Sequence, residues 1–285
     1  MNAPRWSGPG ACARRLSDGR LHLQHGPIDV IAEGWGDPAA VAAGEARMRA
    51  RFDTILAELC AELPLLRTVD AWPEGLVARR MAMSVAPFRP AFVTPMAAVA
   101  GAVADVLLAE LAVPGVTRAY VNNGGDIALH LGPGESLNCV LAARPGMPDR
   151  TTIRSEDPVR GIATSGWRGR SLSLGIADAV TVLARNAAMA DAAATMIANA
   201  VDLPGHPAIA RRPAQEVQAD SDLGDLPVIV GMGPLTPLEI DAALYAGLTA
   251  ARAFKAEGLI EAAALFLNAE MRILGYNMLK EPAHA

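Results

Sequence analysis

The order of strand-like and helix-like segments is the feature that most restricts the fold of this chain of 285 residues. Short runs with strand character follow one another across tight turns, as in Arg20–Ala32, where Gly26 and Pro27 separate two such runs. Helical patterns stand between these pairs without the regular strand–helix alternation of a parallel sheet. The sequence therefore predicts an α+β fold in which antiparallel sheets pack with helices.

Apolar periodicity, proline positions and turn residues set the expected boundaries of the individual elements. Helices are expected at Pro38–Leu63, with Pro64 ending it, at Gly75–Ser84, Thr94–Leu111, Ala187–Val201 and Pro237–Glu257. Strands are expected at Arg118–Asn122, Asp126–Leu131, Ser136–Ala143, Ser171–Leu174, Asp178–Ala184, Pro227–Met232 and Gly258–Asn268, and a loop at Pro204–Pro213.

The composition indicates how such elements pack and which partners they exclude. Apolar residues make up 52% of the chain but aromatic residues only 4%, so the core is built mainly from Ala, Val, Leu and Met. Side chains this small permit close approach of helices to a sheet. The net charge of −5, with no basic block, argues against a nucleic acid as partner.

Cysteine usage and the apolar runs indicate a cytoplasmic protein. The three cysteines lie far apart and form no disulfide framework, so reduced thiols are expected. The first twenty residues contain no apolar core of a secretory signal. The most apolar stretch, Met96–Val113, is interrupted by Asp105 and Glu110, which favours a buried helix over a membrane span.

The strongest chemical signal lies on the alanine-rich helix expected at Ala187–Val201. Asp191 and Thr195 are four residues apart and therefore share one helix face. A carboxylate one turn before a hydroxyl is typical of an oxygen-ligand site for a hard cation such as Mg²⁺. The alternative is a solvated helix face, but the alanines around Asp191 favour a packed one.

A glycine-rich turn joins two expected strands at Asn122-Asn123-Gly124-Gly125-Asp126. Two glycines let a ligand approach the main chain, and Asp126 has the chemistry to bind a ribose hydroxyl, a ring nitrogen or a metal. The alternative is a simple hairpin turn, for which Asn-Gly is a strong signal.

The segment Thr164-Ser165-Gly166-Trp167-Arg168-Gly169-Arg170 combines hydroxyls, free N–H groups and two arginines. These are groups that bind phosphate, and the alternative is a solvated loop. A second anion-binding candidate is the helix start at Thr94-Pro95-Met96, where the alternative is an ordinary capped helix. Asp105 is expected to be paired or to support neighbouring backbone, because it lies in an apolar helix.

These segments together resemble the ApbE-like superfamily, whose characterised enzymes are Mg²⁺-dependent FAD:protein FMN transferases. More closely, the chain is identified as a member of the UPF0280 family, through runs that include FVTPMAAVAGAVAD, YVNNGGDIAL, GIATSGWRGRSLSLGIADAVTV and ADAAATMIANAV. The resemblance implies a single ApbE-like domain over residues 1–285, related to the T-fold and built of two intertwined halves.

The resemblance also implies a site. The match to the transferases covers their GGD turn, their T/S-S-G segment, their glycine-rich helix start and their C-terminal metal motif. It implies that a flavin nucleotide is bound by Thr94, Pro95, Met96, Asn123, Gly124, Gly125, Asp126, Thr164, Ser165, Gly166 and Arg168, and Mg²⁺ by Asp191 and Thr195.

Two departures from the transferase pattern concern the reaction. The transferases carry a Lys-Gly pair where this chain has Ala100-Gly101. They also carry a His and an Asp-Pro after the T/S-S-G segment, where this chain has Arg170–Ser173 and Ala177–Ala179. The flavin and metal pocket is therefore better supported than the transfer step.

Three functions fit these observations. The first is an enzyme that binds FAD with Mg²⁺ and acts as a flavin transferase or FAD pyrophosphatase, with a protein hydroxyl as acceptor. The second is a non-catalytic flavin- or nucleotide-binding module that serves an oxidoreductase partner. The third is a scaffold with a vestigial pocket, against which the acids Asp126, Asp178 and Asp191 argue. A homodimer without membrane contact is the default assembly.

Overall fold

The protein is described by a computed structural model that covers residues 10–70, 72–144 and 147–275. Its backbone contacts divide it into two interleaved units. The first unit comprises Met1–Leu137, Thr152–Ala163 and Ala184–Asp191, and the second Asn138–Thr151, Thr164–Leu183 and Ala192–Ala285. The single ApbE-like domain with intertwined T-fold halves stays a prediction.

The first unit is built on an antiparallel sheet. Its strands follow the order β1 (Cys12–Arg15), β2 (Leu21–His25), β3 (Ile28–Gly36), β4 (Val116–Asn123), β5 (Asp126–Leu131) and β8 (Gly161–Ser165), the last of which continues into the second unit. In the register, Val121 of β4 stands opposite Ala32 of β3 and Ala128 of β5. All three are buried, so alternate residues of these strands line one apolar face.

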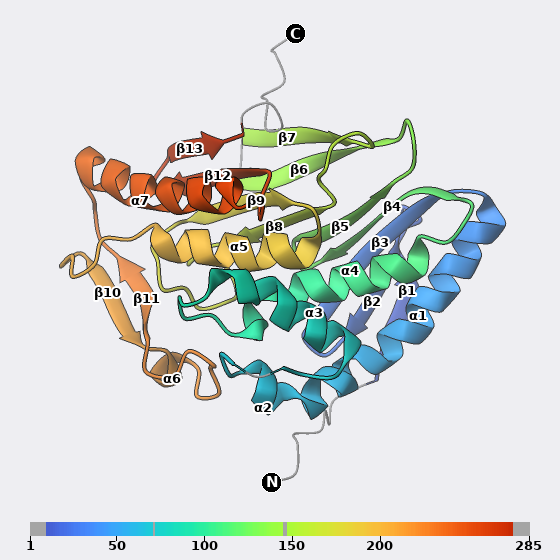
Figure 1. Cartoon of the computed structure of the whole chain (residues 1–285), viewed down its shortest axis with the longest axis horizontal. Helices are drawn as coiled ribbons and strands as arrows, with labels where there is room; N and C mark the ends of the chain where they lie inside the picture. The colour runs from blue at the N-terminus through green and yellow to red at the C-terminus, as the bar shows by residue number, and fades with distance from the viewer. Residues whose placement is uncertain (1–9, 71, 145–146, 276–285) are drawn as a thin grey trace. The chain divides into compact units, whose positions relative to one another are not determined.

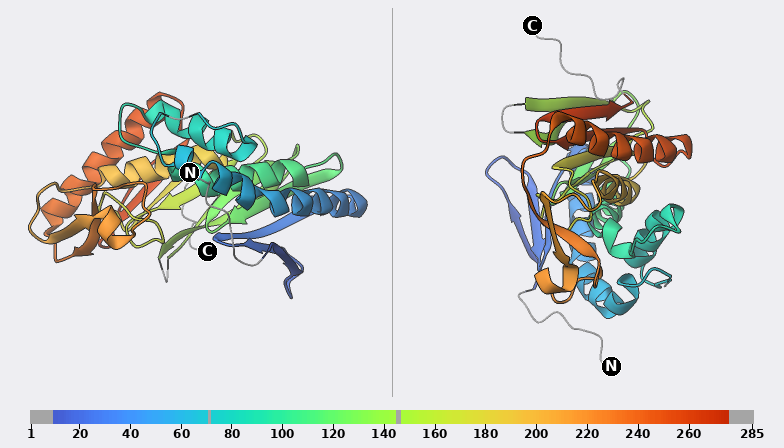
Figure 2. Two further views of the ribbon diagram at one scale, coloured as in Figure 1. Left: turned by 90° about the horizontal axis from the view of Figure 1, so that it is seen from below. Right: turned by 90° about the vertical axis from the view of Figure 1, so that its left-hand side faces the viewer.

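Helices cover that face. They are α1 (Pro38–Ala61), α2 (Leu63–Leu66), α3 (Leu76–Val85) and α4 (Val99–Leu111), with 3₁₀ turns η1 (Ala86–Phe88) and η2 (Pro95–Ala98). Asp37 starts α1 by accepting the N–H of Ala40 at 2.8 Å. Helix α1 packs on β3 and on α4, and α4 packs on β4 and β5 (Figure 1). The left view of Figure 2 shows α1 on one face of the strands β1–β3.

The second unit contains a smaller antiparallel group of strands in the order β9 (Ala179–Ala184), β12 (Ala262–Leu267) and β13 (Glu270–Leu274). Helix α7 (Pro237–Ala256) packs on β12 and β13 and begins with a capping box of Thr236 and Glu239. Every residue of β12 is buried. A separate hairpin pairs β10 (Ile209–Pro213) with β11 (Pro227–Met232), beside α6 (Ala214–Val217).

Several elements contain residues of both units, as β8 and β9 do. Strands β6 (Ser136–Arg144) and β7 (Met147–Arg154) pair with each other. Helix α5 (Ala187–Ala200) begins in the first unit and continues in the second from Ala192.

The α+β architecture with antiparallel sheets and packed helices confirms the expected fold class. The helices and most strands lie within a few residues of their expected positions. No helix in the described part of the chain is long and apolar enough to cross a membrane.

Two expected boundaries were wrong. Segment Ser171–Leu174 is not a strand, because its backbone bonds to scattered partners: Ser173 O accepts from Ile229, and Leu174 N–H donates to Asn199 Oδ1. Helix α1 ends at Ala61, and Pro64 lies in the first turn of α2. Backbone nitrogens in a first turn have no intrahelical acceptor, so a proline there costs no hydrogen bond.

Two further expectations need correction. The loop expected at Pro204–Pro213 contains strand β10, whose pairing with β11 the sequence spacing did not reveal. The chain after Thr94 first forms the 3₁₀ turn η2, and α4 begins only at Val99; the Thr94 side chain makes no capping hydrogen bond there.

Candidate functional site

The start of α5 is held by a carboxylate from α4. Asp105 accepts the backbone N–H of Ala187 at 3.0 Å and that of Ala188 at 3.1 Å, and Arg80 lies 3.3 Å away on the same carboxylate. Asp105 is only 8% exposed, and this burial raises its pKa against the opposing effect of its hydrogen bonds. The expected role of Asp105 as a support for neighbouring backbone is confirmed, and it fixes where α5 begins.

Helices α4 and α5 also approach closely at Gly101. A Cβ atom at Gly101 would lie 2.2 Å from the carbonyl oxygen of Ala187, so only glycine fits there. The backbone N–H of Gly101 donates to Asp191 Oδ2 at 3.0 Å. The small residues of TPMAAVAGAVAD therefore bring the Asp191 carboxylate onto the first turn of α4.

A second carboxylate acts on Asp191. Burial raises the pKa of Asp191 well above its ordinary value, and the negative charge of Asp126 raises it further. Asp126 is itself buried, at the first position of β5. Two acids of like charge, Asp126 buried and Asp191 half-buried, form an environment that favours a proton or a cation.

The hairpin turn between β4 and β5 is connected to the same place. Asn123 Nδ2 donates to the carbonyl oxygen of Ala100 at 3.1 Å. The turn itself is closed by the Gly125 N–H, which donates to Asn122 Oδ1 at 2.8 Å, and both Gly124 and Gly125 are exposed. The structure thus brings Asn123, Asp126 and Asp191 together around the start of α4, within the first unit.

The start of η2 is buried rather than open. Thr94 and Pro95 are buried, and Met96 is half-buried. The carbonyl oxygen of Thr94 accepts the N–H of Ala97 at 3.1 Å, which closes the 3₁₀ turn. A 3₁₀ turn in place of a helix start weakens the expectation of a helix-terminus anion site at Thr94–Met96.

Within the second unit, the T-S-G segment, Thr164-Ser165-Gly166, lies next to Thr195. The Thr195 hydroxyl donates to Ser165 Oγ at 3.5 Å, and the hydroxyls of Thr164 and Thr181 lie 2.8 Å apart. A Cβ atom at Gly166 would lie 2.5 Å from the carbonyl oxygen of Asp178, and its φ of +157° is one that other residues rarely adopt. The glycine therefore lets this turn pack directly against the backbone of Ala177 and Asp178, which precedes β9.

Arg168 is committed to a carboxylate. Its Nε donates to Asp178 Oδ1 at 2.5 Å, and its guanidinium lies 4.8 Å from the centre of the Trp167 ring. The other oxygen of Asp178 accepts the N–H of Asn268 at 2.7 Å. Asp178, which the sequence marked only as an acid in apolar surroundings, therefore positions Arg168.

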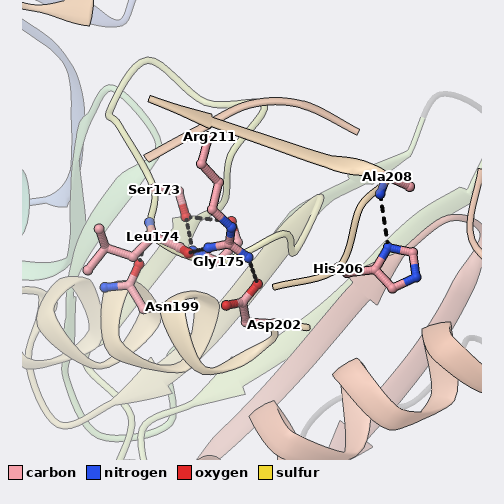
Figure 3. Close-up of polar contacts among 8 residues, drawn as sticks. All are labelled: Ser173, Leu174, Gly175, Asn199, Asp202, His206, Ala208 and Arg211. Carbon is pink, nitrogen blue, oxygen red and sulfur yellow. Dashed lines mark hydrogen bonds and ion pairs between the residues drawn. The ribbon is translucent and has the colours of Figure 1, made fainter. Parts of the chain in front are cut away.

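Sequence reasoning missed a network that supports the chain between the T-S-G turn and β9. Arg211 donates to the carbonyl oxygen of Leu174 at 3.1 Å and to Asp202 at 2.5 Å (Figure 3). Asn199, near the end of α5, accepts from Leu174, and Ser173 bonds to Gly175. No sequence spacing signals these contacts, because Arg211 lies on a strand that was expected to be loop.

The donor set suits Mg²⁺. The described residues contain no group of three His, Cys, Asp or Glu side chains gathered as a metal site. Magnesium does not need one, because it binds through one or two carboxylates and keeps several waters. The mutual repulsion of Asp126 and Asp191 is the observation that fits a divalent cation here.

Comparison with known proteins identifies the family. A family model described as "AbpE bacteria" matches residues 13–273. The chain belongs to this family. It is also similar to a UPF0280 protein of Methanopyrus kandleri, with 33% identity over 184 residues that cover 63% of this chain and 72% of the relative. The resemblance to UPF0280, within the ApbE-like superfamily, is thereby confirmed.

Other relatives match over less of their length. A UPF0280 protein of Methanothrix thermoacetophila is 38% identical over 110 residues, so the match spans 38% of this chain and 46% of that relative. Among solved structures, a mutant of the flavin transferase ApbE from Vibrio cholerae superposes with a TM-score of 0.51 and 13% identity, covering 92% of this chain and 99% of that one. This likeness shows the ApbE fold.

Proposed function

We propose that this protein binds a flavin nucleotide, FAD or FMN, together with Mg²⁺, and acts on FAD as a flavin transferase or pyrophosphatase. Membership of a family with the ApbE fold supports the class of activity. The observation that carries the proposal is the pair of mutually repelling acids, Asp126 and Asp191, at the start of α4. These two acids stand at the GGD turn and the metal motif, the two places where the transferase pattern has its own acids.

Asp191 and Thr195 are the proposed ligands of the metal, since both side chains come from α5 and stand one turn apart in it. When bound, Mg²⁺ neutralises pyrophosphate charge and polarises the phosphorus toward attack. Gly101 supports this arrangement by donating its N–H to Asp191 Oδ2, which fixes the carboxylate at the start of α4.

The remaining residues serve the nucleotide. Gly124 and Gly125 offer exposed turn backbone to a ring system, beside the buried Asn123, while Thr164, Ser165, Gly166 and Arg168 offer donors to phosphates. Thr94, Pro95 and Met96 are proposed to pack against the nucleotide rather than to bind its phosphates, because Thr94 and Pro95 are buried.

The transfer step exchanges the phosphoanhydride bond of FAD for a phosphate ester of the acceptor. A Thr or Ser hydroxyl of an acceptor protein forms a new bond to the phosphorus of the FMN half of FAD and loses its proton. The bond from that phosphorus to the bridging oxygen breaks, and AMP leaves with that oxygen. With water in place of the hydroxyl, the same exchange yields FMN and AMP, which is the pyrophosphatase reaction.

Incubation of the pure protein with FAD and Mg²⁺, followed by chromatography, tests this reaction. The wild type should release AMP in the presence of candidate acceptor proteins, or AMP and FMN without them. The D191N variant should release neither, and the D53A variant, changed at an exposed position on α1, should behave as the wild type. Intact FAD with every acceptor in the wild type would refute the enzyme proposal.

One observation favours a second function, a flavin-binding module that serves an oxidoreductase. Ala100 stands where the transferases carry a lysine, and its contribution to the site is a carbonyl oxygen that accepts from Asn123. A protein that retains bound, intact FAD after long incubation with Mg²⁺ would support this function. Release of AMP would exclude it.

The expectations about partners are retained with this proposal. The protein acceptor or oxidoreductase, the cytoplasmic location and the absence of nucleic acid binding remain predictions from the sequence.

A further inference from the structure

The side chain of Trp167 ends in a donor without an acceptor. Its Nε1 atom is buried, and no hydrogen-bond partner lies within reach of it in the residues that the structure describes. An indole nitrogen has one proton to donate and accepts nothing. The buried N–H group has lost its hydration and has gained no hydrogen bond, which is uncommon in folded proteins.

The ring that carries this donor is held in place. The backbone N–H of Trp167 donates to the carbonyl oxygen of Ala177 at 3.0 Å, directly after the tight passage at Gly166. The guanidinium of Arg168 covers the ring at 4.8 Å, and Asp178 fixes that guanidinium. The donor is therefore fixed beforehand by contacts within the second unit, as a binding group needs to be.

The neighbouring side chains point to the kind of acceptor. The side chains around Gly166, those of Ser165, Trp167 and Arg168, all carry hydrogen-bond donors. Asp178 accepts from Arg168 with one oxygen and from Asn268 with the other, so Arg168 and Asp178 together carry no net charge. Such a segment suits anionic oxygens.

We infer that the Trp167 Nε1–H donates a hydrogen bond to a phosphate oxygen of the bound nucleotide, which makes Trp167 a binding residue of the nucleotide site. The inference rests on the proposed function for the identity of the ligand. It goes beyond that proposal because it adds Trp167, the residue after the T-S-G segment, to the residues proposed to bind the nucleotide.

Indole N–H resonances provide the first test. In a two-dimensional ¹H–¹⁵N spectrum of the full chain, the Trp167 signal is identified by its absence from the W167F variant. Saturating FAD with Mg²⁺ should shift that signal downfield, and ADP, which has the pyrophosphate but no flavin, should do the same. A signal that stays in place with FAD overturns the inference, and one that moves with FAD but not with ADP overturns the assignment to phosphate.

Binding affinity provides the second test. W167F keeps an aromatic ring and removes the donor, so it should bind FAD about tenfold more weakly than the wild type by calorimetry. The matched control is W35F, because Trp35 also lies under an arginine, Arg118 at 4.5 Å, but in the first unit; it should bind as the wild type.

The outcomes separate the inference from the proposed function. Equal FAD affinity in the wild type and W167F refutes the role of Trp167 and leaves the proposed function standing. No FAD binding by the wild type refutes the proposed function and the inference with it. Should W167F fail to fold, the spectrum of the wild type, with the other tryptophans assigned from their own Phe variants, still decides.

Discussion

Replacing Asp105 by alanine should destabilise the protein strongly, although Asp105 is not among the proposed ligand-binding residues. The carboxylate is the acceptor for two backbone N–H groups in the first turn of α5, at 3.0 and 3.1 Å, and both alanines that carry them are fully buried. Leaving one buried donor without a partner costs about 1–3 kcal/mol. Two such donors predict a loss of about 2–6 kcal/mol in the free energy of unfolding.

The lost pair with Arg80 adds little to this sum, because Arg80 is 40% exposed and can turn to water. D105N keeps one oxygen acceptor and should lose less than D105A. Equilibrium unfolding in urea, followed by circular dichroism, measures the differences. The control is D53A, at an exposed position of α1, which should stay within about 0.5 kcal/mol of the wild type. A D105A variant as stable as D53A would refute the reasoning.

Three further predictions concern acid–base behaviour, a close backbone contact and assembly. Because the pKa of Asp191 is raised on folding, the stability that this group contributes is present below the ordinary aspartate pKa and lost as the pH rises through the raised value. Without Mg²⁺, the unfolding free energy should therefore fall less for D191N than for the wild type between about pH 4 and pH 7, and an equal fall would contradict the assignment. The G166A variant should lose at least about 1 kcal/mol in urea unfolding, because its Cβ would meet the Asp178 carbonyl oxygen at 2.5 Å, and a wild-type midpoint would show that the turn has room. The homodimer expected by default should give twice the 29.7 kDa chain mass in light scattering, and a mass of one chain would dismiss it.

The sequence predicted most of the fold because most elements carry local signals. Local signals include the aspartate before α1 and the proline that begins it, the glycines between β4 and β5, and the capping box at the start of α7. Segment Ser171–Leu174 has strand-like composition, but its partners are distant side chains and backbone groups, such as Asn199 and Ile229. The irregular backbone of this segment could therefore not be predicted from local sequence signals.

The candidate site shows the same division. Helical spacing alone singled out Asp191, but Gly101 and Asp126, which act on its carboxylate, come from other elements of the chain. Likewise, Arg168 was expected to offer its charge to a phosphate, and the structure shows that Asp178 holds it. Residue types indicated the kind of chemistry, whereas the compensation of each charge depends on contacts that only the fold brings about.

Flavin binding with and without the metal tests the central claim most directly. The claim is that Asp191 belongs to a Mg²⁺ site beside a flavin nucleotide. Calorimetry of the wild type should show FAD binding at least about tenfold tighter with Mg²⁺ than with a chelator, and D191N should show no dependence on Mg²⁺. FAD binding by the wild type that is unchanged by the chelator, or an equal Mg²⁺ dependence in D191N, would contradict the claim.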